Sequence, residues 1–223
     1  MNLAILDFDY TLYQGRSRYE LAKAMEEAQV IGKGLTKELD ELEQKYLQGE
    51  IGYNQMYKDD KAIFAKYYKD LKRTQAMQFL DQELDLSKKM SSWSKDLIKL
   101  LEEKGYLTVI VSGSWDFIIE KAQEILGFDS FFASEFVLNE GKFTGEYKHI
   151  FDFAKKQTVT KQLIESCDYS IGFGDSVADL VFLRAVDQGF VCNPRQDMLD
   201  QMGETDLVIV NDDNIIDLVK EAL

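Results

Sequence analysis

Two aspartates, Asp7 and Asp9, directly follow residues 3–6, an apolar Leu-Ala-Ile-Leu run that predicts a short buried strand. Side chains two residues apart on an extended backbone point the same way, so both carboxylates are expected on one side at the end of this strand. Carboxylates that lie so close together should hold a cation or share a proton. The pattern therefore indicates a chemically active site, and the simpler alternative is a strand that runs into an acidic turn.

Polar groups that could join this site follow two further apolar runs or lie between them. They are Ser112-Gly113 after residues 108–111, the Lys155-Lys156 pair on a helical stretch, and Asp175 and Asp179 after residues 169–173. In open α/β sheets, ligands bind beyond the carboxyl ends of the strands, so we expect these groups to meet at one edge of a sheet. Carboxylates, hydroxyls and a cation are the groups that phosphoryl transfer needs.

The order of these motifs resembles the haloacid dehalogenase (HAD) superfamily, and within it the phosphoserine-phosphatase-like branch. The order is Asp-x-Asp-x-Thr, then hydrophobic residues with Ser-Gly, then Lys, then Gly-Asp-x-x-x-Asp. The motifs cover residues 1–13 and 107–185, and the remainder to residue 223 matches by element order. Residues 14–106 match only in position and helical character. The resemblance implies an α/β fold with a Rossmann-like parallel sheet, helices on both faces, and a helical cap inserted after the first strand.

The periodicity of the chain agrees with that organisation. Residues 17–106 have a helical pattern, and from residue 108 strands alternate with helices, which is typical of a parallel sheet. One exception is a predicted β-hairpin over residues 136–144 that turns at residues 139–141. We expect a catalytic core of residues 1–15 and 90–223, and a helical cap of residues 16–89.

The resemblance implies roles for both aspartates of the first motif. Asp7 would attack phosphorus and form an aspartyl phosphate, which splits one difficult displacement into two steps. Asp9 would protonate the departing alkoxide and then activate the water that hydrolyses this intermediate. HAD dehalogenases and phosphonatases lack the second aspartate, so its presence favours phosphate ester hydrolysis.

The resemblance also implies a Mg²⁺ site made by Asp7, the backbone carbonyl of Asp9, and Asp175. Mg²⁺ prefers oxygen ligands and needs only one or two carboxylates beside a substrate phosphate. Asp179 would steady this site from outside the ligand shell, or would simply complement the start of a helix.

Phosphate oxygens would be bound by the hydroxyls of Thr11 and Ser112 and by backbone N–H groups, including that of Gly113. A Ser-Gly pair after a strand can also be an ordinary turn. Lys156 is the preferred catalytic lysine because Val159 and Leu163 then fall at the apolar offsets of similar chains. Lys155 and Lys161 remain alternatives, as does a solvated helix face.

Departures from the phosphoserine phosphatase pattern bear on the substrate. Those enzymes carry a glutamate where this chain has Arg16, and a cap arginine where residues 57–61 offer aspartate at the nearest offset. We therefore expect a small phosphorylated metabolite as substrate, with Arg16 contacting it from the cap side and phosphoserine itself a poor substrate. The alternatives are a phosphomutase or phosphotransferase on the same scaffold and a catalytically idle HAD-fold binding protein.

Composition limits the partners. The chain has 223 residues, 45% of them hydrophobic, enough for one sizeable domain and a smaller insert. Its formal charge of −14 argues against nucleic acid or an anionic membrane as partner. Residues 1–2 enter the first strand without a basic leader, and no stretch reaches the length of a membrane span. The two cysteines suggest no metal or redox site. We expect a cytoplasmic protein, and the sequence does not indicate its oligomeric state.

Overall fold

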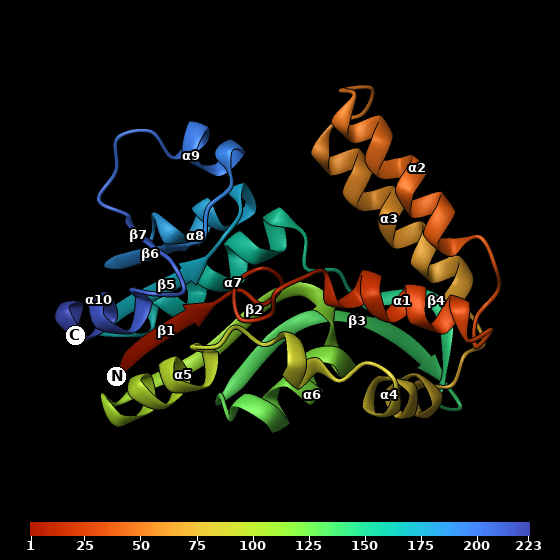
Figure 1. The fold of residues 1–223 in the computed structure, drawn as a ribbon, viewed down its shortest axis with the longest axis horizontal. Coiled ribbons are helices and arrows are strands. Elements are labelled where there is room, and N and C mark those ends of the chain that lie inside the picture. Colours follow the sequence, from red (N-terminus) through yellow and green to blue (C-terminus); the bar gives the residue numbers. More distant parts are fainter. The chain divides into compact units, whose positions relative to one another are not determined.

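The computed structural model describes residues 1–223, except for the side chains of Tyr53 and Asn54. The chain forms two compact units, and each consists of more than one chain segment. Unit 1 comprises Met1–Arg16, Leu86–Ala133 and Phe151–Leu223. Unit 2 comprises Ser17–Asp85 and Ser134–Ile150. Figure 1 shows the elements of both units along the chain.

Unit 1 is built on a parallel sheet. Its strands are β1 (Asn2–Leu6), β2 (Tyr106–Trp115), β5 (Tyr169–Gly174), β6 (Gln188–Cys192) and β7 (Val208–Val210). With β3 (Ser130–Asn139) and β4 (Lys142–His149) at one end, the strand order in the sheet is β4-β3-β2-β1-β5-β6-β7, so β1 is central although it comes first in the chain. In the register of the sheet, Leu6 lies opposite Ile110 on one side and Phe173 on the other. The residues that follow these positions therefore emerge at the same edge.

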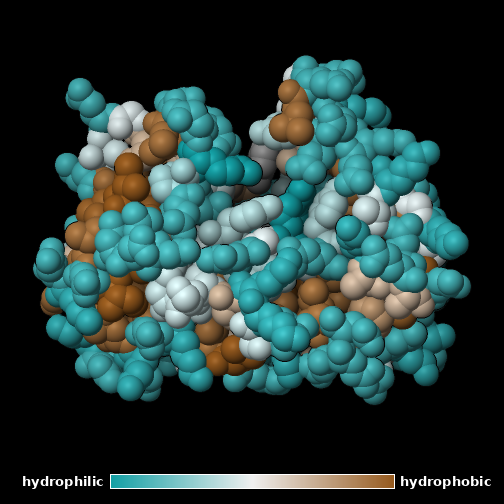
Figure 2. Space-filling view, viewed as in Figure 1, coloured by the Kyte–Doolittle hydropathy of each residue, from teal (hydrophilic) through white to brown (hydrophobic). Residues whose placement is uncertain are grey.

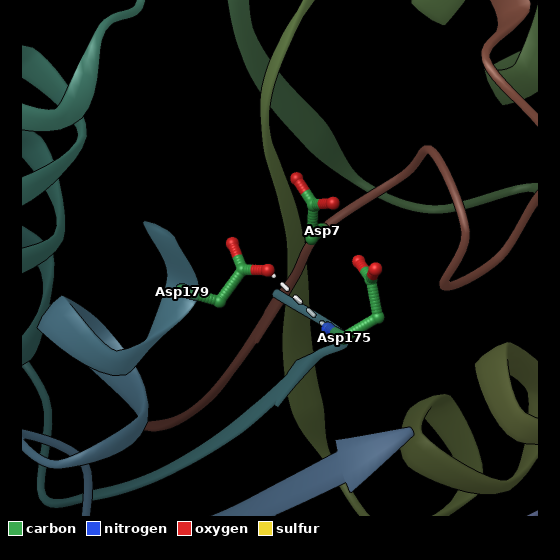
Figure 3. Close-up of side chains that lie close together, drawn as sticks. All are labelled: Asp7, Asp175 and Asp179. Atoms are coloured by element: carbon green, nitrogen blue, oxygen red, sulfur yellow. Dashed lines mark hydrogen bonds between the residues drawn. The ribbon is translucent and has the colours of Figure 1, made fainter. Parts of the chain in front are cut away.

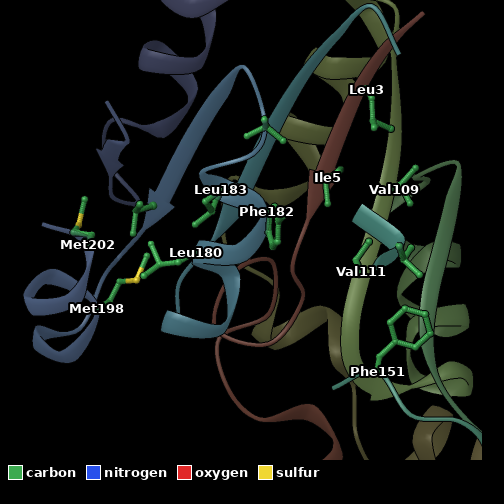
Figure 4. Close-up of a cluster of buried hydrophobic side chains, with 13 residues drawn as sticks. Leu3, Ile5, Val109, Val111, Phe151, Leu180, Phe182, Leu183, Met198 and Met202 are labelled. Atoms are coloured by element: carbon green, nitrogen blue, oxygen red, sulfur yellow. The ribbon is translucent and has the colours of Figure 1, made fainter. Parts of the chain in front are cut away.

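Helices cover both faces of this sheet. They are α5 (Ser94–Glu103), α6 (Asp116–Leu126), α7 (Phe153–Glu165), α8 (Leu180–Leu183), α9 (Gln196–Met202) and α10 (Ile215–Ala222), with short 3₁₀ turns η1 (Leu86–Lys89) and η2 (Val177–Asp179). Leu3 and Ile5 join a buried cluster with Phe182 of α8 (Figure 4). Ala4 and Leu6 alternate with them and are equally buried, so the opposite face is covered as well. The expected α/β fold is confirmed.

Unit 2 is mostly helical. It contains α1 (Ser17–Glu27), α2 (Leu35–Leu47), α3 (Tyr53–Tyr68), α4 (Arg73–Gln82), strand β4 (Lys142–His149) and most of β3 (Ser130–Asn139). The helical segment is thus inserted directly after β1, as expected. Strands β3 and β4 pair antiparallel. Their turn residues Glu140 and Gly141 have φ values of 49° and 75°, the left-handed conformation that a tight hairpin turn requires.

The unit boundaries differ from the expected ones at this hairpin, which groups with the helices and not with the core. The backbone N–H of Asp70 donates to the carbonyl of Phe143 (2.8 Å), and the N–H of Phe143 donates to the carbonyl of Leu71 (2.9 Å). The Tyr68 ring also lies 5.8 Å from that of Phe136. These contacts join segments about seventy residues apart in the chain, so local periodicity could not reveal them. The residues of η1, expected in the cap, belong to unit 1.

One face of the molecule is mostly hydrophilic. Hydrophilic residues cover most of the face seen in Figure 2, in keeping with the formal charge of −14. Within the part of the chain that the structure describes, no helix combines the length and the apolar character needed to cross a membrane.

Candidate active site

Three aspartates meet at the carboxyl edge of the unit 1 sheet. Asp7 follows β1, Asp175 follows β5, and Asp179 ends η2. Figure 3 shows their carboxylates grouped around a common space. One carboxylate oxygen from each lies within 4.8 Å of the other two, and all three side chains are buried. Such a cluster of oxygens is the donor set that a small, hard divalent cation binds.

The sheet register and one glycine bring these aspartates together. The backbone N–H of Asp7 donates to the carbonyl of Phe173 at 2.9 Å, which holds the end of β1 against the end of β5. A Cβ on Gly174 would lie 2.6 Å from the Cβ of Asp179, so only glycine allows the chain after β5 to approach this closely. The Asp179 carboxylate then accepts from Ser176 Oγ at 2.7 Å and from Ser176 N at 3.0 Å, in a capping box that fixes its position.

Lys156 of α7 bridges two of the aspartates. Its Nζ lies 2.8 Å from Asp7 Oδ1 and 2.5 Å from Asp179 Oδ1, and the residue is only 6% exposed. The two alternative lysines lie elsewhere: Lys155 is exposed, and Lys161 pairs with Glu165 on the exposed side of α7. The structure therefore brings Lys156, and neither of the other two, to the first motif.

The charges of this cluster do not balance. Three buried carboxylates face one buried ammonium, so the group would carry two uncompensated negative charges with all three carboxylates ionised. Burial, with a contribution from Asp179, raises the pKa of Asp7 to about 7 despite its contact with Lys156. Burial and the carboxylates of Asp179 and Asp7 likewise raise the pKa of Asp175 well above its ordinary value. A divalent cation would offset this excess, so the residues present fit one.

The ammonium of Lys156 is correspondingly stabilised. Burial alone would lower the pKa of Lys156, but the carboxylates of Asp179 and Asp7 outweigh it and hold the pKa above its ordinary value. This lysine therefore stays protonated and acts as a fixed positive charge.

The expected phosphate donors lie along the same edge. Thr11 is buried, and its hydroxyl donates to Asp175 Oδ1 at 3.3 Å. Ser112 is buried near the end of β2, and its oxygen accepts from the backbone N–H of Ser114 at 3.1 Å. A hydroxyl that accepts in this way can still donate its hydrogen to a phosphate oxygen. Gly113, which lies between Ser112 and Ser114 in the chain, is half-buried.

The remaining residues of the first motif lie in a loop. Asp9 is half-buried and forms an isolated backbone bridge with Tyr13. Its carboxylate is outside the group formed by Asp7, Asp175 and Asp179, although its charge contributes to the raised pKa of Asp7. Arg16 is half-buried and is the last residue of the first segment of unit 1.

Comparison of the sequence with models of protein families identifies the family. The sequence model of the haloacid dehalogenase-like hydrolase family matches residues 4–184, from β1 to the segment after η2. This chain belongs to the haloacid dehalogenase-like hydrolases. The matched range includes all four residues of the buried cluster.

Among curated relatives, the HAD chain described here is similar to proteins named phosphoserine phosphatase. It is 25% identical to one from Archaeoglobus fulgidus over 89% of this chain and 54% of the relative. It is 28% identical to one from Wolinella succinogenes over 80% of this chain and 81% of the relative. It is 26% identical to a third, from Methanocaldococcus jannaschii, over 65% of this chain and 60% of the relative. The chain thus spans little more than half the length of two of these relatives.

Solved structures support the HAD fold. A protein of unknown function from Bordetella pertussis superposes with a TM-score of 0.78 at 18% identity, covering 95% of this chain and 98% of that one. A structure described as a phospho-aspartyl intermediate analogue of phosphoserine phosphatase gives a TM-score of 0.71 at 20% identity, with 97% of each chain covered.

Sequence reasoning missed the residues that hold the first-motif loop. Ser91 Oγ donates to the carbonyl of Thr11 at 2.7 Å. Asp212 accepts from Trp93 Nε1 at 2.8 Å, from Asn193 at 2.9 Å and from Gln14 at 3.3 Å. These residues come from four separate parts of the chain and match no motif, so nothing local indicated them.

Proposed function

We propose that this protein is a Mg²⁺-dependent phosphomonoesterase that acts on a small phosphorylated metabolite through an aspartyl phosphate on Asp7. The observation that carries the proposal is the buried contact between Asp7 and Lys156 beside Asp175, at the sheet edge of a HAD-family hydrolase.

Asp7 is the proposed nucleophile. One of its oxygens is held by Lys156, so the carboxylate has a fixed orientation, and its other oxygen can attack phosphorus. Attack forms the Asp7–phosphorus bond while the bond from phosphorus to the ester oxygen breaks. Lys156 keeps a positive charge beside the transferred group and so offsets the negative charge in the transition state.

Asp9 is the proposed acid and base. It stands two residues after the nucleophile, and it is half-buried whereas Asp7 is buried, so it retains access to solvent protons. It would give its proton to the leaving alkoxide and then take one from the water that hydrolyses the aspartyl phosphate.

Asp7, the backbone carbonyl of Asp9, and Asp175 are the proposed Mg²⁺ ligands. When bound, the ion supplies positive charge that polarises the phosphoryl group and keeps the clustered carboxylates ionised. Asp179 orients Lys156. The Thr11 hydroxyl has a single proton, which it donates to Asp175 in this structure and would turn to donate to a bound phosphate. Ser112, Thr11 and the N–H of Gly113 are the proposed phosphate donors.

Unit 2 is the proposed cap, and Arg16, the residue directly before its first helix, is the proposed contact to the leaving group. The names of the relatives called phosphoserine phosphatase do not establish phosphoserine as the substrate of this chain. Where their pattern expects a cap arginine, residues 57–61 offer aspartate at the nearest offset, and Asp60 in this stretch is buried and paired with Arg18 at 2.7 Å. A cation at Arg16, where the phosphoserine phosphatase pattern has a glutamate, would repel an amino group, so phosphoserine should be a poor substrate.

A phosphatase screen over a panel of phosphorylated metabolites, with and without Mg²⁺, tests the proposal. Asp7→Asn is the control, since it keeps the shape of the side chain and removes the nucleophile. Fluoride complexes of beryllium or aluminium should inhibit the parent because they mimic the transferred phosphoryl group. Hydrolysis that persists in Asp7→Asn would contradict the covalent mechanism.

A further inference from the structure

Tyr10 projects from the first motif toward solvent. Its neighbours Phe8 and Leu12 are completely buried, whereas Tyr10 is 45% exposed. Its φ is +63°, a conformation that is rare for a bulky residue and persists only where the surroundings hold it. Here its backbone N–H donates to the carbonyl of Tyr13 at 2.6 Å. The loop therefore presents one aromatic ring at the surface, between Asp9 and Thr11.

Arg195 lies over this ring. Its guanidinium carbon is 6.0 Å from the centre of the Tyr10 ring, within the range of a cation–π contact. The side chain of Arg195 is 65% exposed. Arg195 pairs with Asp197 at 3.5 Å, and the Asp197 side chain is 56% exposed; a pair this long and exposed holds the guanidinium weakly.

The sheet places Arg195 at the edge that carries the candidate site. Strands β5 and β6 are parallel neighbours, and Gly174 lies opposite Val191 in their register. Asp175 comes directly after Gly174, and Arg195 comes four residues after Val191. Tyr10 comes three residues after Asp7. A ring and a guanidinium from separate segments thus meet within unit 1, on loops that follow the same sheet edge as Asp7 and Asp175.

We propose that Tyr10 and Arg195 form a second recognition point, which favours phosphate esters whose leaving group carries its own carboxylate or phosphate. The inference rests on the proposed function. A guanidinium that stacks on a ring keeps its in-plane N–H donors available, and these match a carboxylate or phosphate in a bidentate manner. Because the protein has a formal charge of −14, a second anionic group is repelled in general, and a local cation is needed to accept it.

Two matched aryl esters test this preference: phenyl phosphate and 4-carboxyphenyl phosphate. The measured quantity is the ratio of kcat/KM for the carboxylated ester to kcat/KM for the plain one. Arg195→Gln should lower this ratio about five- to tenfold, the effect of losing one charge-assisted contact at an exposed site. Arg195→Lys should lower it less, since an ammonium keeps the charge and loses the bidentate geometry.

The ring is tested separately. Tyr10→Phe should retain the ratio of the parent, because the ring face is kept. Tyr10→Asn should lower it, because asparagine tolerates a positive φ and has no ring. Lys99→Gln is the charge control: Lys99 is 72% exposed on α5 and pairs with Glu103. This variant should leave both kcat/KM values unchanged. Added salt should reduce the preference of the parent for the carboxylated ester.

The outcomes distinguish a failure of this inference from a failure of the proposed function. If the parent hydrolyses both esters and the ratio is the same in Arg195→Gln and Tyr10→Asn, the second recognition point is wrong and the phosphatase proposal stands. If the parent hydrolyses neither ester with Mg²⁺, the proposed function fails and this inference falls with it. A ratio that falls equally in Lys99→Gln would mean that net charge alone sets the preference, which also overturns the inference.

Discussion

Lys156→Met should lower the unfolding free energy of unit 1 far more than the same substitution at a solvent-exposed lysine. Lys156 Nζ makes two buried contacts, at 2.8 Å with Asp7 and 2.5 Å with Asp179, whose side chains are 10% and 0% exposed. Methionine fills a similar volume but leaves the buried carboxylates without their cation. Breaking a buried ion pair by removing one partner costs about 3–5 kcal/mol of unfolding free energy.

The cost should depend on pH in a defined direction. Burial already raises the pKa of Asp7 to about 7, so the folded protein binds a proton there more tightly than the unfolded chain. Such a group contributes stability that is present at low pH and is lost as the pH rises through its folded-state pKa. Removing Lys156 raises that pKa further. The variant should therefore lose more stability, relative to the parent, at pH 8 than at pH 5.5.

Urea denaturation in the absence of divalent cations measures this effect. Trp93 and Trp115 both belong to unit 1, so tryptophan fluorescence reports the unfolding of that unit. Lys161→Met is the matched control: it removes a lysine from the same helix, but one that is 74% exposed and pairs with Glu165 at 3.8 Å. It should cost less than about 1 kcal/mol. A Lys156→Met cost equal to that of the control at pH 8 would refute the reasoning.

Four further predictions concern catalysis and stability. Asp7→Asn should abolish turnover while the far-UV circular dichroism stays that of the parent, and activity within about tenfold of the parent would contradict the covalent role. A chelator should silence hydrolysis, and Mg²⁺ should restore it better than Ca²⁺, which prefers more ligands and looser geometry; full activity in chelator would exclude the metal role of Asp175. Arg16→Glu should shift preference away from acidic esters with little loss on an aryl phosphate, as competition assays would show. Glu26→Gln should cost about 1–2 kcal/mol of unfolding free energy at pH 7, because the carboxylate accepts from Thr36 N at 2.8 Å and Thr36 Oγ1 at 2.5 Å. Partial burial would raise the pKa of Glu26, but these donors outweigh it and lower the pKa, so the difference between parent and variant should vanish as the pH falls below about 4.

The fold could be predicted because its signals are local. Strands β1 and β5 are mostly apolar runs, and Asp7 and Asp175 directly follow them, so the pairing of these two strands alone brings both aspartates to one edge. The chemical roles of these residues stay predictions. The choice among the lysines depended on apolar spacing, and the structure then places Lys156 against Asp7.

What could not be predicted depends on contacts between distant segments. The β3–β4 hairpin has an ordinary hairpin pattern, and only its pairing with residues 70–71 assigns it to unit 2. Asp212 and Ser91 occur in unremarkable polar stretches, yet both hold the loop that follows Asp7. Their role arises from hydrogen bonds across more than 75 residues of chain, and no short pattern encodes these.

The position of β1 at the centre of the sheet has a consequence for how the chain folds. Asn2 is paired with Tyr106 on one side and with Tyr169 on the other. During synthesis, β1 emerges first, but its second neighbour exists only after about three quarters of the chain has been made. Until then its apolar Leu3–Leu6 segment lacks one of its two ladder partners, whereas helices α1–α4 of unit 2 can form from local contacts. The strand that carries the proposed nucleophile is therefore completed late, and the nascent chain must keep it from pairing with other exposed strands.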